Sequence, residues 1–524
     1  MRTMGRDQQR AVDRDAAELA GIPTLLLMEQ AATSVAKHCR QLVENTNVPI
    51  DIITGKGNNG GDGYALARLL RADGYEVRIF ETCAPSDFPE VGDSAINRQA
   101  VFGLNIPVYP AEVYRAQPGL IVDCVYGTGF KCGRPLAPAL VKLFSEIEQA
   151  REKYQAKVVA VDVPSGVDGN TGLVAEGAIR ATHTVTFIYP KPGLLSYPGR
   201  ANAGHILIED IGIPADFVDR VYRGLVDAGP KVIDQSDVRS WCPKRADEGH
   251  KGTFGHALLC AGSRGFAGAG ILSCRSALVS GCGLVTWLVP EDLYPGISTA
   301  SPAALIRPRP VDTHDLILDF KEQCMIREAV LIGPGCGVNQ ETGLLLEQSL
   351  RHAQRVVVDA DALTVLADSE DLQAELSART VRKLEPAILT PHPGEFYRLY
   401  PEAKSFPEGR IKAARDLADR WHAVIVLKGA GTIVAIPECI QAERSTWINT
   451  TGNHGLARGG SGDVLAGLMT GLLAQQLPLT EAVCGAVYLH GLAGDLMSEA
   501  VGARAMDIAN LPDYIGMAFR VNEW

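Results

Sequence analysis

The chain lacks the segments that would carry a protein into or across a membrane. Its 524 residues contain no apolar run near the ~20 residues that a membrane-spanning helix needs. The N-terminal stretch MRTMGRDQQRAVDRDAAELAG is rich in charge and has no hydrophobic core like that of a secretory signal. We therefore expect a cytoplasmic protein without a membrane partner.

Paired cysteine motifs are also absent. The 12 cysteines are scattered without any Cys-x-x-Cys pair, and several lie in apolar or glycine-rich runs, among them Cys260, Cys282 and Cys336. This pattern predicts reduced, buried thiols in an intracellular protein, and it disfavours both disulfides and a zinc centre.

The sequence has no excess of positive charge. Its 50 Lys and Arg stand against 61 Asp and Glu, which gives a formal net charge of -11. This balance disfavours a nucleic acid or an anionic membrane as partner. A small anionic ligand remains compatible with it, because backbone N–H groups and single lysines bind phosphate locally. We expect small molecules as partners, together with further copies of the same chain.

The pattern along the chain predicts the α/β fold class, with parallel sheets and more than one domain. We place the domains at 1–225 and 226–524, joined by a linker-like segment at 223–255. In the first half, strands are predicted at 49–55, 75–80, 119–127, 157–166 and 184–189, and helices at 7–20, 23–43, 63–73, 92–101 and 137–154. In the second half, strands are predicted at 256–262, 284–290, 328–335, 355–361, 387–393 and within 423–436, and a helix at 464–475.

Four loops of the second half follow predicted strands or precede a helix, where open parallel sheets bind ligands. They are IGPGCG (332–337), TPHPGEF with His392, LKGAGT with Lys428 at a hairpin tip, and GGSGD, which ends on Asp463. An ionised aspartate that faces a substrate hydroxyl is a general base, and the N-terminus of the following helix attracts phosphate oxygens. Taken singly, Asp463 reads as a helix cap, His392 as a loop histidine and Lys428 as a solvated lysine. Together they favour a site, and a small-molecule kinase would use the same arrangement.

The first half carries a similar set of loops. TGKGNNGGDGYALARLL (54–70) lacks the Gly-Lys-Ser/Thr of a Walker loop, but Asn58 to Asp62 would offer amides and N–H groups at a helix start, or simply form a glycine turn with an aspartate cap. Asn59, Asp123 and Ser165 form a hard oxygen set suited to an alkali or alkaline-earth cation. Asp162 and Lys131 are a candidate acid/base pair. Asp123 and Asp162 are alternatively turn caps.

Nine short motifs, in order, resemble a known pair of domains. GNNGGDG, DCVYGTG, DVPSG and FIYPKPG are similar to the NAD(P)H-hydrate epimerase domain, which has a Rossmann-like fold. HKGTFGHALLCAGSRGFAGAG, GPGCG, TPHPGEF, KGAGT and GNHGLARGGSGDVLAG are similar to the ADP-dependent NAD(P)H-hydrate dehydratase, which has a ribokinase-like fold. The order is that of the fused, bifunctional repair enzymes of bacteria.

The resemblance implies an isomerase and a lyase on one chain: the first domain interconverts the R and S hydrates of NADH and NADPH, and the second dehydrates the S form with ADP, with or without Mg²⁺. It implies catalytic roles for Asp463, Asp162 and, most weakly, Lys131. It implies K⁺ ligation by Asn59, Asp123 and Ser165. Nucleotide binding falls to Lys428, Gly429, Ala430, Gly431, Thr432 and Gly462. Hydrate contacts fall to Asn58, Asn59, Gly60, Gly61, Asp62, Gly127, Thr128, Gly129, Phe130, Lys131, Cys132, Gly133, Asp162, Ala269, Gly337, His392 and Asp463.

Two further interpretations stay open at this stage. A vitamin-type kinase fused to a ligand-binding domain would use the same loops in the second half. The first half would then be a binding module without turnover.

Overall fold

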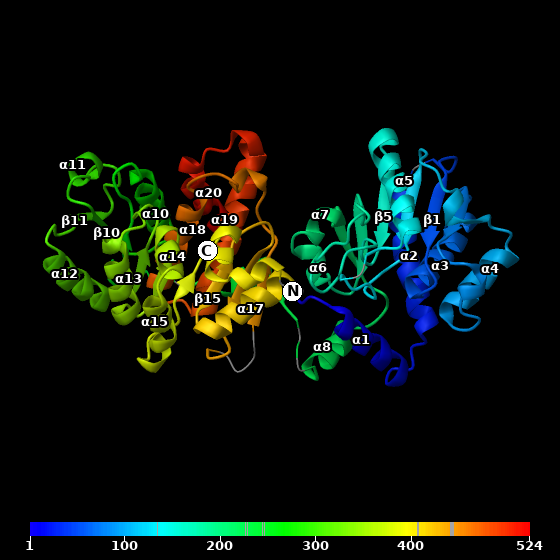
Figure 1. Cartoon of the computed structure of the whole chain (residues 1–524), viewed down its shortest axis with the longest axis horizontal. Coiled ribbons are helices and arrows are strands. Elements are labelled where there is room, and N and C mark those ends of the chain that lie inside the picture. Colours follow the sequence, from blue (N-terminus) through cyan, green and yellow to red (C-terminus); the bar gives the residue numbers. More distant parts are fainter. Residues whose placement is uncertain are drawn as a thin grey trace. The chain divides into compact units, whose positions relative to one another are not determined.

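The chain forms two compact units, Met1–Pro230 and Lys231–Trp524, in a computed structural model (Figure 1). The structure describes every residue except 44, 134, 226, 228, 244, 246, 406, 407 and 441–444. Both units alternate strands and helices around a largely parallel sheet, which confirms the predicted α/β class. Residue 226, the predicted first residue of the second domain, lies outside the described residues.

The first unit is built on a seven-stranded parallel sheet in the order β3-β2-β1-β4-β5-β6-β7. This Rossmann-like order reverses its winding between β1 and β4, and ligands bind at the carboxyl ends of strands at such a switch point. The edge strands β3 and β7 were missed in the sequence. The strands are β1 Ile50–Thr54, β2 Val77–Glu81, β3 Val108–Pro110, β4 Leu120–Cys124, β5 Lys157–Val161, β6 His183–Phe187 and β7 His205–Glu209.

Helices cover both faces of this sheet, because its central strands are apolar on both sides. Neighbouring residues of β1 show this alternation: Ile52 belongs to the core under α2 and α3, and Ile53 to the core under α5. The helices are α1 Arg6–Glu18, α2 Thr24–Leu42, α3 Asn58–Ala72, α4 Asp93–Gly103, α5 Pro138–Tyr154, α6 Pro192–Leu195, α7 Gly199–Ala203 and α8 Ala215–Arg223.

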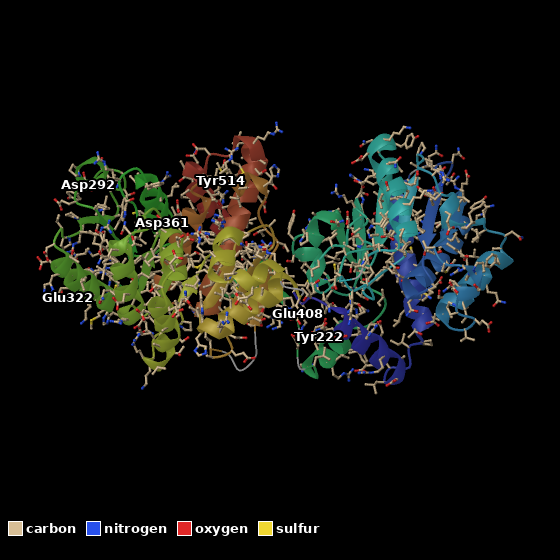
Figure 2. The ribbon with its side chains drawn as sticks, viewed as in Figure 1. Tyr222, Asp292, Glu322, Asp361, Glu408 and Tyr514 are labelled. Carbon is tan, nitrogen blue, oxygen red and sulfur yellow. The ribbon has the colours of Figure 1, made fainter. Side chains whose placement is uncertain are left out.

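The N-terminal segment is fixed to its unit by long-range hydrogen bonds. The hydroxyl of Tyr222, labelled in Figure 2, donates to the carbonyl of Thr3 at 2.8 Å. The guanidinium of Arg6 donates to the carbonyls of Thr128 (2.6 Å) and Phe130 (2.5 Å). Helix α1 is thereby joined to the loop that follows β4.

The second unit has a ten-stranded sheet in the order β11-β10-β9-β12-β13-β14-β15-β16-β17-β8. The strands are parallel except around β16, which runs antiparallel to β15 and β17. The predicted hairpin is therefore confirmed. The strands are β8 Lys231–Val232, β9 His256–Cys260, β10 Leu284–Val289, β11 Leu305–Pro308, β12 Ala329–Ile332, β13 Val356–Val358, β14 Ile388–Leu389, β15 Val424–Leu427, β16 Thr432–Ile436 and β17 Ser445–Asn449.

One face of the second sheet is covered by α10, α18, α19 and α20, which share a single large apolar core with it. The α/β class holds here as well, as expected of a ribokinase-like domain. The helices are α9 Gln235–Ser240, α10 Ala267–Val279, α11 Tyr294–Ile297, α12 Thr313–Ile326, α13 Gln340–His352, α14 Asp361–Ala367, α15 Glu370–Val381, α16 Pro393–Leu399, α17 Gly409–Trp421, α18 Ser461–Ala474, α19 Leu479–Val501 and α20 Leu511–Val521. Among the described residues, none of the helices is both long and apolar enough to cross a membrane.

Two expectations from the sequence are wrong in detail. Helix α3 begins at Asn58, five residues before the predicted start at residue 63, so the Asn/Gly segment is the first turn of the helix. The glycines do not break the helix there, because they let it approach the neighbouring strands. The segment 223–255 is also not all linker: β8 pairs with β17 and α9 follows it, although residues 226, 228, 244 and 246 lie outside the described part.

Candidate active sites

Asp463 lies in the first turn of α18, directly after a glycine bend. Gly460 precedes the helix with a φ of 94°, in the left-handed region that favours glycine. The hydroxyl of Ser273 donates to the backbone carbonyl of Asp463 at 3.1 Å and ties the start of α18 to α10. The local sequence therefore fixes where the helix starts and where its first carboxylate stands.

Lys428 and Asp359 form a buried ion pair beside this helix start. The ammonium Nζ of Lys428 lies 2.7 Å from Asp359 Oδ1, and the two side chains are 18% and 2% exposed. Lys428 follows β15 and Asp359 follows β13, so both stand at carboxyl ends of strands of one sheet. A β-carbon placed on Gly462 would meet Lys428 Nζ at 3.1 Å. The alternative of a solvated turn lysine is therefore wrong.

Burial gives Asp463 the properties of a proton acceptor near neutral pH. Burial, followed by the nearby carboxylate of Asp359, raises the pKa of Asp463 to about 6, against the opposing charge of Lys428. Asp359 and the carboxylate of Glu395 together raise the pKa of Lys428, although burial alone would lower it. The result is an ammonium that keeps its charge next to a carboxyl poised to take up a proton.

The GPGCG loop packs on the start of α10 and is connected through Asp361 to the surroundings of Asp463. A β-carbon on Gly335 would lie 3.0 Å from the β-carbon of Ala269. The N–H of Gly337, whose φ is 85°, donates to Asp361 Oδ2 at 2.7 Å (Asp361 is labelled in Figure 2). Asp361 is one of the charges that act on Asp463. Two of the predicted hydrate contacts are therefore linked to the predicted base.

His392 caps helix α16 and keeps its ring exposed. Its Nδ1 accepts the N–H groups of Gly394 (3.0 Å) and Glu395 (3.2 Å), and Glu395 accepts the N–H of His392 at 2.7 Å. The ring is 57% exposed, with Nε2 at 3.5 Å from Glu395 Oε1. Because Nδ1 accepts, Nε2 carries the proton and is available as a donor. The capping role and the predicted contact with substrate are therefore compatible.

The predicted nucleotide segment is a tight turn between β15 and β16. Gly429 has a φ of 144°, and the hydroxyl of Thr432 donates to its carbonyl at 2.8 Å. Lys428 to Thr432 therefore form one compact loop. The Nζ of Lys428 places this loop beside Gly462.

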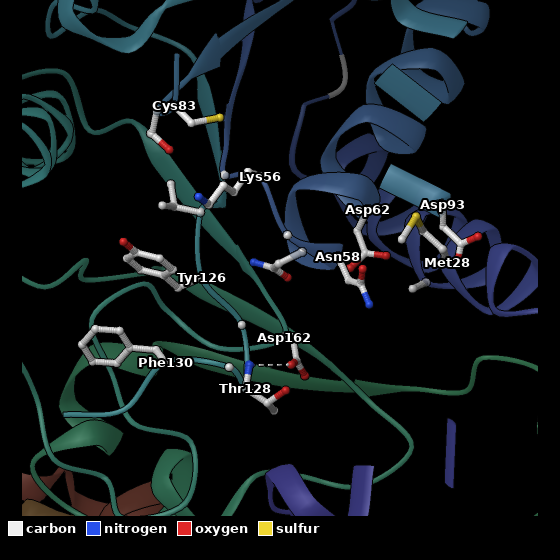
Figure 3. Close-up of a pocket in the computed structure, with 18 of the residues that line it drawn as sticks. Met28, Lys56, Asn58, Asp62, Cys83, Asp93, Tyr126, Thr128, Phe130 and Asp162 are labelled. Atoms are coloured by element: carbon white, nitrogen blue, oxygen red, sulfur yellow. Dashed lines mark hydrogen bonds between the residues drawn. The ribbon is translucent and has the colours of Figure 1, made fainter. Parts of the chain in front are cut away.

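The first unit contains a cavity of about 780 Å³ at the carboxyl ends of its central strands (Figure 3). The first turn of α3 forms one wall. A β-carbon on Gly60 would lie 1.8 Å from the carbonyl oxygen of Gly55, and one on Gly61 would lie 2.6 Å from Met28 Cε. Close backbone packing therefore requires glycine at position 60, whereas at position 61 the end of the Met28 side chain could move aside. Gly55, Gly57 and Gly60 also have the Gly-x-Gly-x-x-Gly spacing of dinucleotide-binding turns.

Asp162 stands in a strained backbone conformation at the end of β5. Its φ is 67°, in the left-handed region that non-glycine residues rarely adopt. Its Oδ2 accepts the N–H of Thr128 at 3.2 Å, drawn as a dashed line in Figure 3, and its Oδ1 accepts the hydroxyl of Thr186 at 3.2 Å. A β-carbon on Gly127 would meet both Asn59 Oδ1 and Asp162 Oδ2 at 3.2 Å, so these predicted residues converge.

The lysine that pairs with Asp162 is Lys191. Its fully buried Nζ lies 2.9 Å from Asp162 Oδ1 and 3.1 Å from the carbonyl of Phe187. Lys131 is exposed, and among the described residues it has no ion pair. The ion-pair partner of Asp162 is thus Lys191, and the proposed acid/base role of Lys131 stays a prediction. The YPKPG motif carried the signal for Lys191, since it follows a strand end beside the site.

Two of the three predicted cation ligands, Asp123 and Ser165, are in direct contact. Asp123 is fully buried; its Oδ1 accepts the hydroxyl of Ser165 at 2.6 Å and its Oδ2 accepts the N–H of Ser165 at 2.7 Å. Burial raises the pKa of Asp123 to about 6. The buried Nδ2 of Asn59 has no hydrogen-bond partner among the described residues. The carboxylate of Asp123 and the hydroxyl of Ser165 are oxygen ligands of the kind that hard cations prefer.

The loop at 127–133 is divided between the cavity and the surface. Gly127, Thr128, Gly129 and Phe130 line the cavity, and Figure 3 shows Thr128 and Phe130 there. Cys132 donates its N–H to Asp168 Oδ2 at 3.1 Å, and Gly133 has a φ of 122°. Lys131, Cys132 and Gly133 thus shape the outer part of the loop.

Comparison with known families matches both units. Residues 24–193 match the family described as YjeF-related protein N-terminus, and residues 257–516 match NAD(P)H-hydrate dehydratase. A bifunctional NAD(P)H-hydrate repair enzyme of Moorella thermoacetica is 35% identical, with 97% of this chain and 95% of that protein covered. The chain belongs to this family. The predicted enzyme class, an epimerase and a dehydratase in one chain, is confirmed with it.

One further relative matches nearly the whole chain, and one solved structure matches about half of it. The repair enzyme of Escherichia coli is 32% identical over 95% of this chain and 90% of its own. A solved structure, an ADP/ATP-dependent NAD(P)H-hydrate dehydratase from Bacillus subtilis co-crystallised with ATP and Mg²⁺, is 32% identical; it covers 56% of this chain and 99% of its own, with a TM-score of 0.48.

Several residues of the sites were missed in the sequence. Asp359 and Asp361 come from VVVDAD, for which the sequence predicts only a strand, and Glu395 comes from TPHPGEF. A carboxylate at the carboxyl end of a buried parallel strand is the signal that identifies Asp359. Gln9 and Asp13 of α1 line the cavity of the first unit, and nothing local in the sequence indicated this.

Proposed function

We propose that the second unit dehydrates the S hydrate of NADH or NADPH with ADP as phosphoryl donor, and that the first unit interconverts the R and S hydrates. The family membership supports the two activities. The arrangement of Asp463, Lys428 and Asp359 supports the placement of the dehydration, and the Asp162 cavity supports the placement of the epimerisation.

Asp463 is the proposed base of the dehydration. It takes the proton from the C6 hydroxyl of the hydrate as that oxygen forms a bond to the terminal phosphorus of ADP and AMP departs. The phosphorylated oxygen then leaves C6 as phosphate, driven by the lone pair of the ring nitrogen, and loss of the C5 proton restores the reduced nicotinamide. Lys428, held by Asp359, stabilises negative charge on the phosphoryl oxygens. The GPGCG loop and His392 hold the hydrate so that its C6 hydroxyl is aligned with the terminal phosphorus of ADP.

A Mg²⁺ ion in this reaction would arrive with the nucleotide. Among the described residues there is no cluster of three or more His, Cys, Asp or Glu side chains arranged to hold a metal. Asp359 is already engaged by Lys428, and Asp361 by the N–H of Gly337. We therefore assign no protein ligands to Mg²⁺.

In the first unit, Asn59, Asp123 and Ser165 would hold K⁺. The ion would supply positive charge beside the phosphate-facing turn of α3. Asp162, oriented by Lys191, Thr186 and the N–H of Thr128, is the proposed proton acceptor at the C6 oxygen. Asn58 to Asp62 and the 127–130 wall would bind the hydrate.

The observation that carries the dehydratase proposal is the buried carboxyl of Asp463 beside the Lys428–Asp359 pair. The test supplies purified S hydrate and ADP and follows the near-ultraviolet absorbance of reduced nicotinamide. Wild type should restore it and Asp463→Asn should not, while nucleotide affinity is kept. Turnover by Asp463→Asn within tenfold of wild type would overturn the base assignment.

A vitamin-type kinase is the second candidate, and the kinase-like loops favour it. Phosphorus NMR separates the two reactions. A kinase leaves a stable phosphorylated alcohol, whereas the proposed repair releases inorganic phosphate together with AMP.

The twelve cysteines are free thiols in the structure, which supports the proposed cytoplasmic location. The expected homo-oligomer stays a prediction.

A further inference from the structure

Five carboxyl groups line the cavity of the first unit, together with the cationic side chains of Arg10 and Lys56. Three of the five, Asp13 of α1, Asp62 of α3 and Asp162 after β5, matter for acid/base chemistry, and the other two are Asp93 and Glu112. The YPKPG loop places the buried ammonium of Lys191 against Asp162. Figure 3 shows Asp62 and Asp162 entering the cavity from different elements. The mechanism above names Asp162 as its acid/base group and assigns Asp62 only to hydrate binding.

The four groups are not equivalent. Lys191 pairs with Asp162 at 2.9 Å and donates to Gln9 Oε1 at 3.4 Å. The Nε2 of Gln9 in turn donates to Asp13 Oδ1 at 2.9 Å. The ammonium of Lys191 therefore contacts Asp162 directly and Asp13 through the amide of Gln9. Among the described residues, Asp62 has neither an ion pair nor a hydrogen bond to its carboxyl.

The surroundings of Asp62 favour its protonated form. Burial, reinforced by the negative charges of Asp162 and Asp13, raises the pKa of Asp62 well above its ordinary value. Burial also raises the pKa of Asp13. Asp162 has a direct ion pair with Lys191, whereas Asp62 has no ion pair among the described residues, and such a difference in environment suits two carboxyl groups to the roles of base and acid.

We propose that Asp62 is the second acid/base group of the epimerase, working opposite Asp162 across the cavity. This rests on the proposed function of the first unit. An epimerase that runs in both directions needs a proton donor for the departing oxygen on one face of the ring and an acceptor for the entering water on the other.

The proton transfers balance as follows. Asp62 donates its proton to the C6 hydroxyl, the C6–O bond breaks with its electron pair on oxygen, and the ring nitrogen's lone pair forms a C6=N bond as water departs. A water molecule then adds to the opposite face, its proton passes to Asp162, and the C6=N pair returns to nitrogen. The enzyme is left with Asp62 ionised and Asp162 protonated, the state that catalyses the reverse conversion. Exchange with solvent resets it.

The test is the Asp62→Asn variant of the full chain, which keeps the size of the side chain and removes the acid. Interconversion of separated R and S hydrates is followed by HPLC without ADP, and hydrate binding is measured by equilibrium dialysis. We expect epimerisation to fall by about 100-fold or more, the range for loss of a general acid/base. The dissociation constant should change by less than about threefold, because the isosteric amide keeps a polar contact with the hydrate while the acid is removed. Asp73→Asn is the matched control: it lies at the other end of α3, exposed and paired with Arg40 at 2.7 Å. It should behave as wild type.

The outcomes separate this inference from the function on which it rests. If wild type does not interconvert the epimers, the epimerase proposal fails. If wild type does so and Asp62→Asn keeps more than a third of that rate, or loses hydrate binding instead, the role of Asp62 is overturned. Asp62→Glu covers the case in which Asn disturbs the helix. It restores a carboxyl group and should be clearly more active than Asn, and equal loss in both would also overturn the role. Dehydration of S hydrate by the same samples verifies that the protein is folded.

Discussion

At the residue scale, the account depends on how single carboxyl groups are held. Asp463 and Asp162 are both aspartates that follow strand–loop segments, but they are fixed differently. Asp463 stands at a helix start with an ammonium and a carboxylate nearby, whereas Asp162 has a strained backbone and a direct lysine partner. Each environment sets the charge that its proposed reaction needs.

Dehydration should therefore depend on the protonation of Asp463. The pKa of Asp463 is raised to about 6 by burial, and only the ionised form accepts a proton. We expect kcat with saturating S hydrate and ADP to be constant above about pH 7 and to fall about tenfold per pH unit below about pH 6. A steady-state pH profile measures this, and a rate unchanged down to about pH 5 would contradict the assignment of the base.

The ionised carboxyl of Asp463 should also lower the free energy of unfolding of the second unit. Its folded pKa of about 6 lies above the ordinary 3.8, so the folded state binds this proton more tightly than the unfolded state. The ionised form is then unfavourable, and the cost is complete above about pH 6 and absent below about pH 4. Asp463→Asn should stabilise the second unit by up to about 3 kcal/mol at pH 8.

Thermal unfolding of wild type and Asp463→Asn near pH 8 and near pH 5 checks this expectation. The gain should shrink at the lower pH. A variant that is less stable than wild type at pH 8 would show that Asp463 is held by favourable contacts instead.

At the scale of elements, the glycines of the first turn of α3 act by packing. A β-carbon on Gly60 would lie only 1.8 Å from the carbonyl oxygen of Gly55. Gly55 is itself held in place by a hydrogen bond from its N–H to the carbonyl of Cys124 at 3.1 Å. Because the clashing atom belongs to the backbone of Gly55, no movement of a side chain can remove the clash.

Gly60→Ala should therefore displace α3 from β1 and abolish epimerisation, with a loss of about 1–3 kcal/mol or more in the stability of the first unit. Gly103→Ala, at the end of α4 with open space around it, is the control and should be neutral. Epimer exchange and chemical denaturation are the measurements. Wild-type epimerisation in Gly60→Ala would show that the contact between α3 and the loop after β1 is not needed.

The sequence indicated the elements better than their contacts. Strands such as β1, β4 and β9 are apolar on both faces and carry a pattern that predicts them, and the loop motifs at their carboxyl ends placed Asp463, Asp162 and Asp123. The predicted start of α3 lies five residues after the observed one, because glycines and asparagines disfavour a helix unless tertiary packing selects them. The edge strands β3 and β8 are too short to stand out.

Pairings between distant side chains were beyond the sequence. Lys191 reaches Asp162 only because β5 and β6 are neighbours, and Lys428 reaches Asp359 across β14. Asp13 lies on α1, ahead of residue 24, where the match to the family begins. No local pattern distinguishes it from the other charged residues of that helix.

At the scale of the whole molecule, each unit has its own core and its own site. The two proposed activities should therefore be separable by substitution. Asp123→Ala removes the only carboxylate of the proposed cation set, and we expect it to abolish epimerisation and its dependence on K⁺ while dehydration of pure S hydrate continues. Assays of both reactions on one preparation measure this. Equal loss of both activities would contradict the division of labour between the units.

The central claim is that one chain both interconverts the hydrates and converts the S form to the reduced nucleotide with ADP. The most direct measurement is HPLC of an equal mixture of R and S hydrates incubated with the purified protein, with and without ADP. With ADP, both epimers should disappear and the reduced nucleotide should accumulate to the full amount of hydrate. Without ADP, the epimers should only interconvert. If half of the hydrate persisted as the R form with ADP present, or if neither epimer changed, the account would be contradicted.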